Sequence, residues 1–275
     1  EGTGGSLIQW DYQDPERFRC RYCGQIYPSR KYPETADLVC PRQEQTLTFF
    51  LNEGERTHSR DRTGKYAYHW ASRAHPMHMS FSGVIRQCKA YFMIAAAESL
   101  ALCYRIEGDA RYAESSVQTL VRLSECYRKW LYHDYWNSIA DCDPMYAAWH
   151  DMDLPLVWKK HLCTDAFGRD TLKSARMLQN YWGGGRLHPS CDSATLLVRL
   201  ARAYDLVHAA EDTNGNRLWT RDARTQVERD LFMEWLMGGE PFLGGGLKAS
   251  NVNNKAGRVY WPMAAGARCL GIPEW

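Results

Sequence analysis

The chain has 275 residues, of which 45% are hydrophobic and 24% charged, a composition that is typical of a globular protein and excludes a disordered or fibrous one. A formal net charge of +2 does not indicate a nucleic-acid-binding protein, although a local basic cleft could still bind an acidic polymer. No apolar run approaches the roughly 18 residues that span a bilayer, so no membrane insertion is expected. The 11 Trp and 16 Tyr exceed what the core needs, and their flat faces suit sugar rings as well as packing.

The N-terminal part is rich in Tyr, Arg, Pro and His and has no sustained hydrophobic period, which predicts an irregular segment over residues 1–80. Within it, Cys20 and Cys23 have zinc-knuckle spacing, and Cys40 offers a third thiolate. A structural zinc site normally has four ligands; His58 is a distant candidate for the fourth, and a missing upstream pair is another explanation of the half motif. Structural zinc therefore stays open on this half motif, catalytic zinc is less favoured, and no cofactor is expected for catalysis.

The pattern changes from Val84 on, where apolar and small residues recur at spacings of three and four and predict a long helix with one packed face. Gly108 and Asp109 break this helix. A second stripe of the same kind over 113–131 predicts another helix directly after the break. Two helices joined by a tight turn form an antiparallel hairpin, with which we expect the helical part of the chain to begin.

The remaining chain shows further helical patterns separated by Gly, Pro and Asn. They are, in order, an aromatic and broken helix over 144–162 with Pro155 inside it, a helix after Asp170 that stops at Gly183, a helix from Ser190 to about Ala209, a helix after Thr220, and a last helix up to Leu270 before Gly271. No stretch shows convincing strand alternation, so we expect an all-α fold. Successive hairpins without a strict sequence period favour an incomplete α/α toroid over residues 81–275 rather than a solenoid.

Four segments together point to a known family over most of residues 18–272. They are Cys20 to Gly24 followed by Tyr27-Pro28, Glu107 to Ala113, Ala203 to Val207, and Asn254-Lys255. In this order and spacing they resemble the helical domain of the heparinase II/III-like polysaccharide lyases. Tyr204, in the third segment, falls on the packed stripe of its helix and is expected to be structural.

The resemblance implies an incomplete α/α toroid joined to a C-terminal β-sandwich, and cleavage of an acidic, uronate-containing polysaccharide by β-elimination in the cleft between them. It also implies a periplasmic or secreted protein. In the family the catalytic Tyr lies on a later helix and a further His or Tyr on the sandwich, and neither position is present here. We therefore expect the chain to be truncated at its C-terminus and its activity to belong to a longer lyase.

Three asparagines, Asn251, Asn253 and Asn254, stand before the last predicted helix. The elimination removes a weakly acidic proton from the carbon beside a uronate carboxylate, so the carboxylate must be neutralised, and a fixed amide N–H is a suitable donor. On the resemblance, Asn254 is the candidate neutraliser, and Asn251 and Asn253 are neighbouring candidates for substrate binding. The alternative is that Asn254 caps the helix, because Asn is a preferred residue there.

Lys255 stands where the family often has His, and it completes the candidate catalytic pair. A Lys binds an acidic group as a point charge but does not readily act as a neutral imidazole base at pH 7. Arg258 and Tyr260 lie within two turns of the pair and are candidates for substrate binding; Tyr260 is also a residue type that can act as an acid or base. Its helical phase beside Val259 favours a packing role in the core or at the rim.

Further candidates for a sugar-binding cleft are His188, Trp149 and His150, with ordinary packing as the alternative for each. Two other functions stay open beside the lyase. A non-catalytic carbohydrate-binding or scaffold toroid would use the aromatic residues alone. A glycoside hydrolase would need two carboxylates flanking the bond, for which the candidates are Asp141, Asp143, Asp151 and Asp153.

Overall fold

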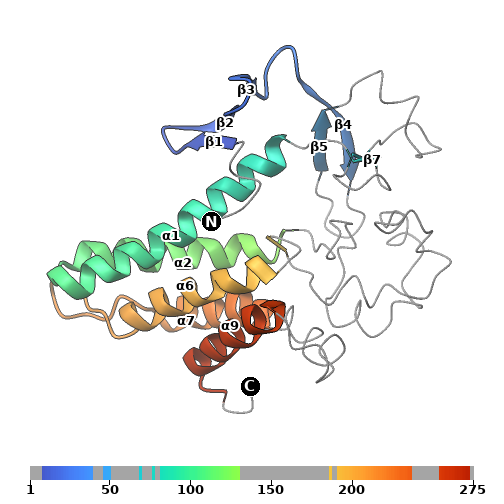
Figure 1. Ribbon diagram of the computed structural model, residues 1–275. Helices are drawn as coiled ribbons and strands as arrows, with labels where there is room; N and C mark the ends of the chain where they lie inside the picture. The colour runs from blue at the N-terminus through green and yellow to red at the C-terminus, as the bar shows by residue number, and fades with distance from the viewer. Residues whose placement is uncertain are drawn as a thin grey trace. The chain divides into compact units, whose positions relative to one another are not determined.

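The computed structural model describes residues 8–39, 46–50, 68–69, 76–77, 81–130, 186–187, 191–236 and 254–272 (Figure 1). Of 35–39, 46–50, 68–69, 76–77, 191–195 and 254–259 it describes the backbone but not the side chains. The described residues up to Ala90 belong to one compact unit, and those from Tyr91 on belong to a second. This division falls inside helix α1 (Phe81–Glu107), which contributes to both units.

The N-terminal unit contains antiparallel strands, which corrects the prediction of an irregular segment and of a purely α-helical fold. Its three-stranded sheet has the order β1-β2-β3, with Phe18 of the central strand opposite Trp10 on one side and Tyr27 on the other. Its strands and those of two further antiparallel pairs are β1 (Ile8–Asp11), β2 (Asp14–Cys20), β3 (Ile26–Tyr27), β4 (Glu34–Val39) with β5 (Thr46–Phe50), and β6 (Tyr68–His69) with β7 (Pro76–Met77).

An aromatic cluster joins this sheet to the first turns of α1. Phe18 and Tyr27 stack with their ring centroids 5.5 Å apart, and Tyr27 stacks in turn on Phe81 at 4.7 Å. Ile85, one turn further along the helix, is buried in the same cluster. Only Phe18 of β2 is buried, so this strand has no apolar alternation that the sequence pattern could reveal.

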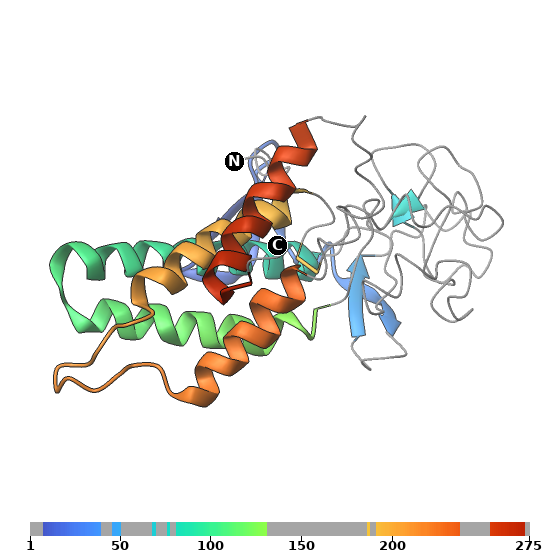
Figure 2. The same cartoon turned by 90° about the horizontal axis from the view of Figure 1, so that it is seen from below.

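The second unit is built from packed helices, and the described residues of the protein are mostly helical. Figure 1 shows the end of α1 and α2 running antiparallel, and Figure 2 shows α6 and α9 side by side. No helix in the described ranges is both long and apolar enough to cross a membrane. The helices after α1 are α2 (Ala110–Tyr127), α6 (Cys191–Val207), α7 (Arg221–Val227), the π-helical turn η4 (Glu228–Met233) that continues α7, and α9 (Asn254–Leu270).

The local signals for these helices are confirmed. Gly108 takes a positive φ of 75° between α1 and α2, and the Asp109 side chain caps α2 by accepting a hydrogen bond from the backbone N–H of Arg111 at 3.0 Å. Thr220 caps α7 by accepting from the N–H of Ala223 at 3.1 Å. Gly271, with φ 69°, follows the last residue of α9. The helix expected after Asp170 lies outside the described residues.

Helix α6 passes through the centre of the hydrophobic core. Leu197 and Leu200 are fully buried, and Tyr204 is 1% exposed, so its predicted structural role is confirmed. The Tyr204 ring packs edge-on against Trp219 and Phe232, each at 5.3 Å between centroids. The described part of the second unit is thus a helical assembly around α6, and the incomplete α/α toroid predicted from the sequence stays a prediction.

Helix α9 approaches α6 closely at Gly266. A Cβ atom at this position would lie 3.0 Å from Leu197 Cδ2 and 3.3 Å from Leu236 Cδ2. One turn further on, the Cys269 thiol donates a hydrogen bond to the backbone oxygen of Ala201 at 3.4 Å. Gly266 therefore allows the contact by which α9 is held against the core.

A large side chain at Gly266 should destabilise the protein. We expect Gly266→Leu to lower the free energy of unfolding by about 1–3 kcal/mol, because the added atoms must displace Leu197 and Leu236 in a packed core. Ala264→Leu, on the exposed face of the same helix, should change it by less than about 0.5 kcal/mol. Denaturant unfolding measures both, and equal effects of the two substitutions would contradict the close contact.

Candidate functional site

The asparagine-lysine pair opens helix α9, as the sequence suggested. Asn254 is the first residue of the helix and Lys255 the second, and their side chains are outside the described part of the structure. The capping position is the residue before the first helical one, which here is Asn253. Asn251 and Asn253 lie outside the described residues. The backbone thus places Asn254 inside the first turn of α9, where helical N–H groups have no partner within the helix.

The outward face of α9 carries two adjacent aromatic side chains. Tyr260 is 48% exposed, which places it at the rim rather than in the core, and Trp261 is 59% exposed. Pro262 and Met263, next to them, are buried. The sequence analysis did not single out Trp261. Its signal was available, since two residues of an α-helix correspond to about 200° of rotation, which puts Trp261 opposite the packed Met263.

The remaining predicted site residues are placed only in part. Arg258 belongs to α9 by its backbone, and its side chain is not described. Cys20 and Cys23 lie at the turn between β2 and β3. Wherever side chains are described, no three His, Cys, Asp or Glu residues come together as a metal-binding group. Outside the described residues lie His188, Trp149, His150, Cys40 and the four candidate aspartates of a hydrolase.

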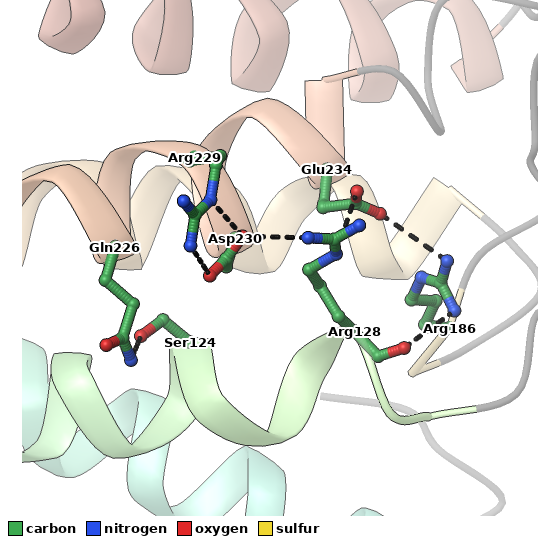
Figure 3. Close-up of polar contacts among 7 residues, drawn as sticks. All are labelled: Ser124, Arg128, Arg186, Gln226, Arg229, Asp230 and Glu234. Carbon is green, nitrogen blue, oxygen red and sulfur yellow. Dashed lines mark hydrogen bonds and ion pairs between the residues drawn. The ribbon is translucent and has the colours of Figure 1, made fainter. Parts of the chain in front are cut away.

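A network of charged side chains, which the sequence analysis missed, joins the end of α2 to η4 and the residue after it (Figure 3). We call it the α2-end network; it consists of Arg128, Arg186, Arg229, Asp230 and Glu234. Arg128 Nη1 lies 3.2 Å from Asp230 Oδ1, and Arg128 Nε lies 3.2 Å from Glu234 Oε1. Arg186 Nη2 is 3.4 Å from the other oxygen of Glu234. Glu234 therefore lies between two guanidinium groups.

Arg186 is the most buried member of the network, with a side chain that is 8% exposed. Its Nη1 donates to the backbone oxygen of Trp130 at 2.6 Å and to that of Arg128 at 3.3 Å. Carbonyl groups at the end of a helix lack partners within it, and a cation there also interacts favourably with the helix dipole. Arg186 thus binds the turn that follows α2 and ties it to Glu234. Its Nε is buried and has no hydrogen-bond partner in the described structure.

Asp230 is held in its ionised form by two arginines. Arg229 donates from Nε and Nη2 to the two carboxylate oxygens, each at 2.7 Å, and Arg128 adds a third contact. The hydrogen bonds from Arg229, and then the nearby charges, lower the pKa of Asp230 in spite of its partial burial. A glycosidase acid needs a raised pKa, so Asp230 cannot serve as one at neutral pH.

A second polar cluster surrounds the hydroxyl group of Tyr204. This hydroxyl donates to the carboxylate of Glu228, which also accepts from Arg224 Nε at 3.0 Å, and Arg224 in turn contacts the ring of His208. Burial raises the pKa of Tyr204, and the hydrogen bond to Glu228 raises it further. Tyr204 therefore stays protonated at neutral pH and cannot act as a general base, which agrees with its structural role.

Both clusters meet at η4, the π-helical turn within the α7 helix. Such turns are rare and are frequent at functional sites, because they shift the side chains that follow out of the regular α-helical phase. Here η4 supplies Glu228 to one cluster and Asp230 to the other. The sequence does show charged residues directly before the buried Leu231. It does not show their partners, because these lie on segments that are distant along the chain.

Comparison with known proteins identifies no relative of this chain. No family model matches it, and no curated protein and no solved structure is significantly similar to it.

The buried and exposed arginines of the α2-end network should differ in their contribution to stability. We expect Arg186→Met to lower the free energy of unfolding by about 3 kcal/mol, because it leaves two backbone carbonyls without their donor and removes one of the two guanidinium groups that contact Glu234. Arg229→Met is the matched control; its side chain is 64% exposed and its loss should matter much less. Denaturant unfolding compares the two, and an equal or larger effect of Arg229→Met would contradict the assignment.

Proposed function

We propose that this chain forms the helical part of a polysaccharide lyase that cleaves a uronate-containing acidic polysaccharide by β-elimination. The observation that carries the proposal is the layout of α9, which begins with Asn254 and Lys255 and carries an exposed Tyr260-Trp261 pair on its outward face. The mostly helical second unit supports a helical domain, and its toroid arrangement is part of the proposal. No metal or other cofactor takes part in the proposed chemistry.

The proposed reaction needs a group that neutralises the substrate carboxylate. A base removes the proton from the carbon beside the carboxylate, the electron pair forms a carbon–carbon double bond, and the glycosidic oxygen at the next carbon leaves with the electrons of its bond. Negative charge accumulates on the carboxylate in between. We assign its stabilisation to the amide N–H of Asn254, assisted by the positive charge of Lys255 and the positive end of the α9 dipole.

The exposed aromatic pair suits the rest of the polymer. Sugar rings stack on flat aromatic faces, while their hydroxyl groups keep their contacts with water or with polar side chains. Trp261 and Tyr260 supply such faces on the same helix as the Asn-Lys pair. Arg258, four residues after Asn254, adds a positive charge that suits an acidic chain.

The described tyrosines of the core do not remove the proton. Burial raises the pKa of both Tyr127 and Tyr204, so both stay protonated at neutral pH. The resemblance assigns the base to a tyrosine of a later helix and a further residue to a β-sandwich. The proposal for this chain is therefore limited to carboxylate neutralisation and polymer binding.

The lyase proposal is tested with the protein at its full natural length. We expect it to release unsaturated product, seen as rising ultraviolet absorbance, from at least one of alginate, heparan sulfate and chondroitin sulfate. Asn254→Ala should lower the rate about a hundredfold or more, because one donor to the developing charge is lost. Asn214→Ala, in the exposed loop before α7, should leave the rate unchanged. Absence of product on all three polymers, or full activity of Asn254→Ala, would refute the proposal.

A non-catalytic carbohydrate-binding protein is the second candidate, and the exposure of Trp261 is the observation that favours it. Whether the protein is a lyase or only binds carbohydrate, we expect Trp261→Ala to weaken binding to the polymer about tenfold, roughly 1.4 kcal/mol, because a stacking face is lost. Tyr22→Ala is the control, since Tyr22 is 89% exposed in the turn between β2 and β3. Binding by affinity electrophoresis without any unsaturated product would select the binding function; unchanged binding by Trp261→Ala would remove Trp261 from the site.

A further inference from the structure

The turn between β2 and β3 has a closed geometry that brings two cysteines together. Cys20 ends β2, and its backbone oxygen accepts a hydrogen bond from the N–H of Gly24 at 2.8 Å. The N–H of Cys20 donates to the backbone oxygen of Gln25 at 2.9 Å, and Gly24 takes a positive φ of 71°. This turn places the thiol of Cys23 within hydrogen-bonding reach of the thiol of Cys20.

Backbone and side-chain donors surround the two sulfur atoms. The backbone N–H groups of Cys23 and Tyr22 are directed at the Cys20 sulfur and donate hydrogen bonds to it. The hydroxyl group of Tyr27 is hydrogen-bonded to the Cys23 side chain. The ring of Tyr27 is fixed between Phe18 and Phe81, so this hydroxyl is anchored by the aromatic cluster. Donors of this kind stabilise thiolates and orient them as metal ligands.

Cys88 and Cys269, on helices α1 and α9, have a different environment. Cys88 and Cys269 lie on helices and are partly buried, and burial raises the pKa of both thiols, that of Cys269 to about 11. Cys23 is exposed and Cys20 partly exposed, and neither is in a disulfide. The Cys20–Cys23 pair thus combines accessible sulfur with hydrogen-bond donors directed at it, which a cysteine that merely fills space in a core does not need.

We propose that Cys20 and Cys23 bind one thiophilic divalent metal ion, Zn²⁺ in the native protein, at the tip of the β2–β3 turn. The Cys-x-x-Cys spacing, the N–H groups directed at Cys20 and the glycine after Cys23 all serve a metal-binding knuckle. Zn²⁺ prefers four ligands, and water can occupy the positions that the two thiolates leave open. The proposal does not depend on the function of α9.

The ion would have a structural role in the N-terminal unit. The sheet there has short strands, and its described core is small, with Phe18, Phe81 and Ile85 as the buried members. A three-stranded sheet of this size gains little from burial alone, and metal binding adds directly to the stability of the folded form. A metal at the turn would hold β2 and β3 in register beside the aromatic cluster, to which Tyr27 connects Cys23.

The test uses the complete protein, reduced, freed of metal with a chelator and titrated with Cd²⁺ as a spectroscopic probe of thiolate ligands. We expect one ion per chain, with the ultraviolet charge-transfer band of cadmium bound to thiolate. Cys20→Ser and Cys23→Ser should each weaken binding at least a hundredfold, since loss of a ligand exceeds the loss caused by removing a group that only orients one. Cys126→Ser, on α2, is the control and should bind as the unchanged protein does.

A second measurement on the unchanged protein covers the case in which a variant does not fold. Zn²⁺ should protect Cys20 and Cys23 from alkylation, read peptide by peptide by mass spectrometry, while the reactivity of Cys126 stays the same. Absence of the charge-transfer band, equal loss of binding in Cys126→Ser, or alkylation of the pair unaffected by Zn²⁺ would each overturn the proposal.

Discussion

Helix α6 is the element on which the other described helices of the second unit depend. It contacts α2 and α9 directly, and its Tyr204 packs against Phe232 of η4. Glu98 of α1 forms ion pairs with Arg199 and Arg202 on the same helix, at 3.7 and 2.7 Å. Because α6 is covered on several sides, each of its buried polar groups must find a partner within the protein. This requirement explains why the hydroxyl of Tyr204 is bonded to Glu228.

The same requirement governs the chemistry that the described core can perform. Hydrogen bonds from Arg229 and Arg128 keep Asp230 ionised, and burial keeps Tyr204 protonated. A general acid needs the carboxyl protonated and a general base needs the phenol ionised, so both groups are stabilised in the state without catalytic use. The two clusters at η4 therefore stabilise the helical assembly. Chemistry is better sought at exposed side chains, and the outward face of α9 provides them.

The N-terminal unit is stabilised differently, because its described residues bury little apolar surface. One aromatic stack of Phe18, Tyr27 and Phe81 connects the sheet to the start of α1. The turn between β2 and β3 is closed by backbone hydrogen bonds around Cys20 and Gly24. A metal ion bound there would add to the stability that this small aromatic cluster provides. The two proposals thus concern separate units, one structural and one directed at a substrate.

The sequence by itself predicted the described helices and several of their caps, because these depend on local signals. Thr220 caps α7, and Gly108 and Asp109 separate α1 from α2, since capping and positive φ are properties of single residues and their near neighbours. The turn motif of Cys20 and Cys23 was visible for the same reason. The strands were not, because the pairing of short and mostly exposed strands leaves no hydrophobic period to detect.

Only the tertiary structure decided which charges meet. Arg128 follows the last residue of α2 and Asp230 lies on η4, and nothing in either segment shows that they form a contact of 3.2 Å. From the sequence alone, Gly266 would be expected only to weaken its helix. The structure shows that Leu197 and Leu236 leave no room for a larger side chain there. Contacts between distant segments depend on how helices pack, and packing is a property of the whole chain. Local residue patterns therefore determined the secondary-structure elements. The packing of these elements determined the two polar clusters at η4, the protonation states of their side chains and which aromatic residues of α9 are exposed.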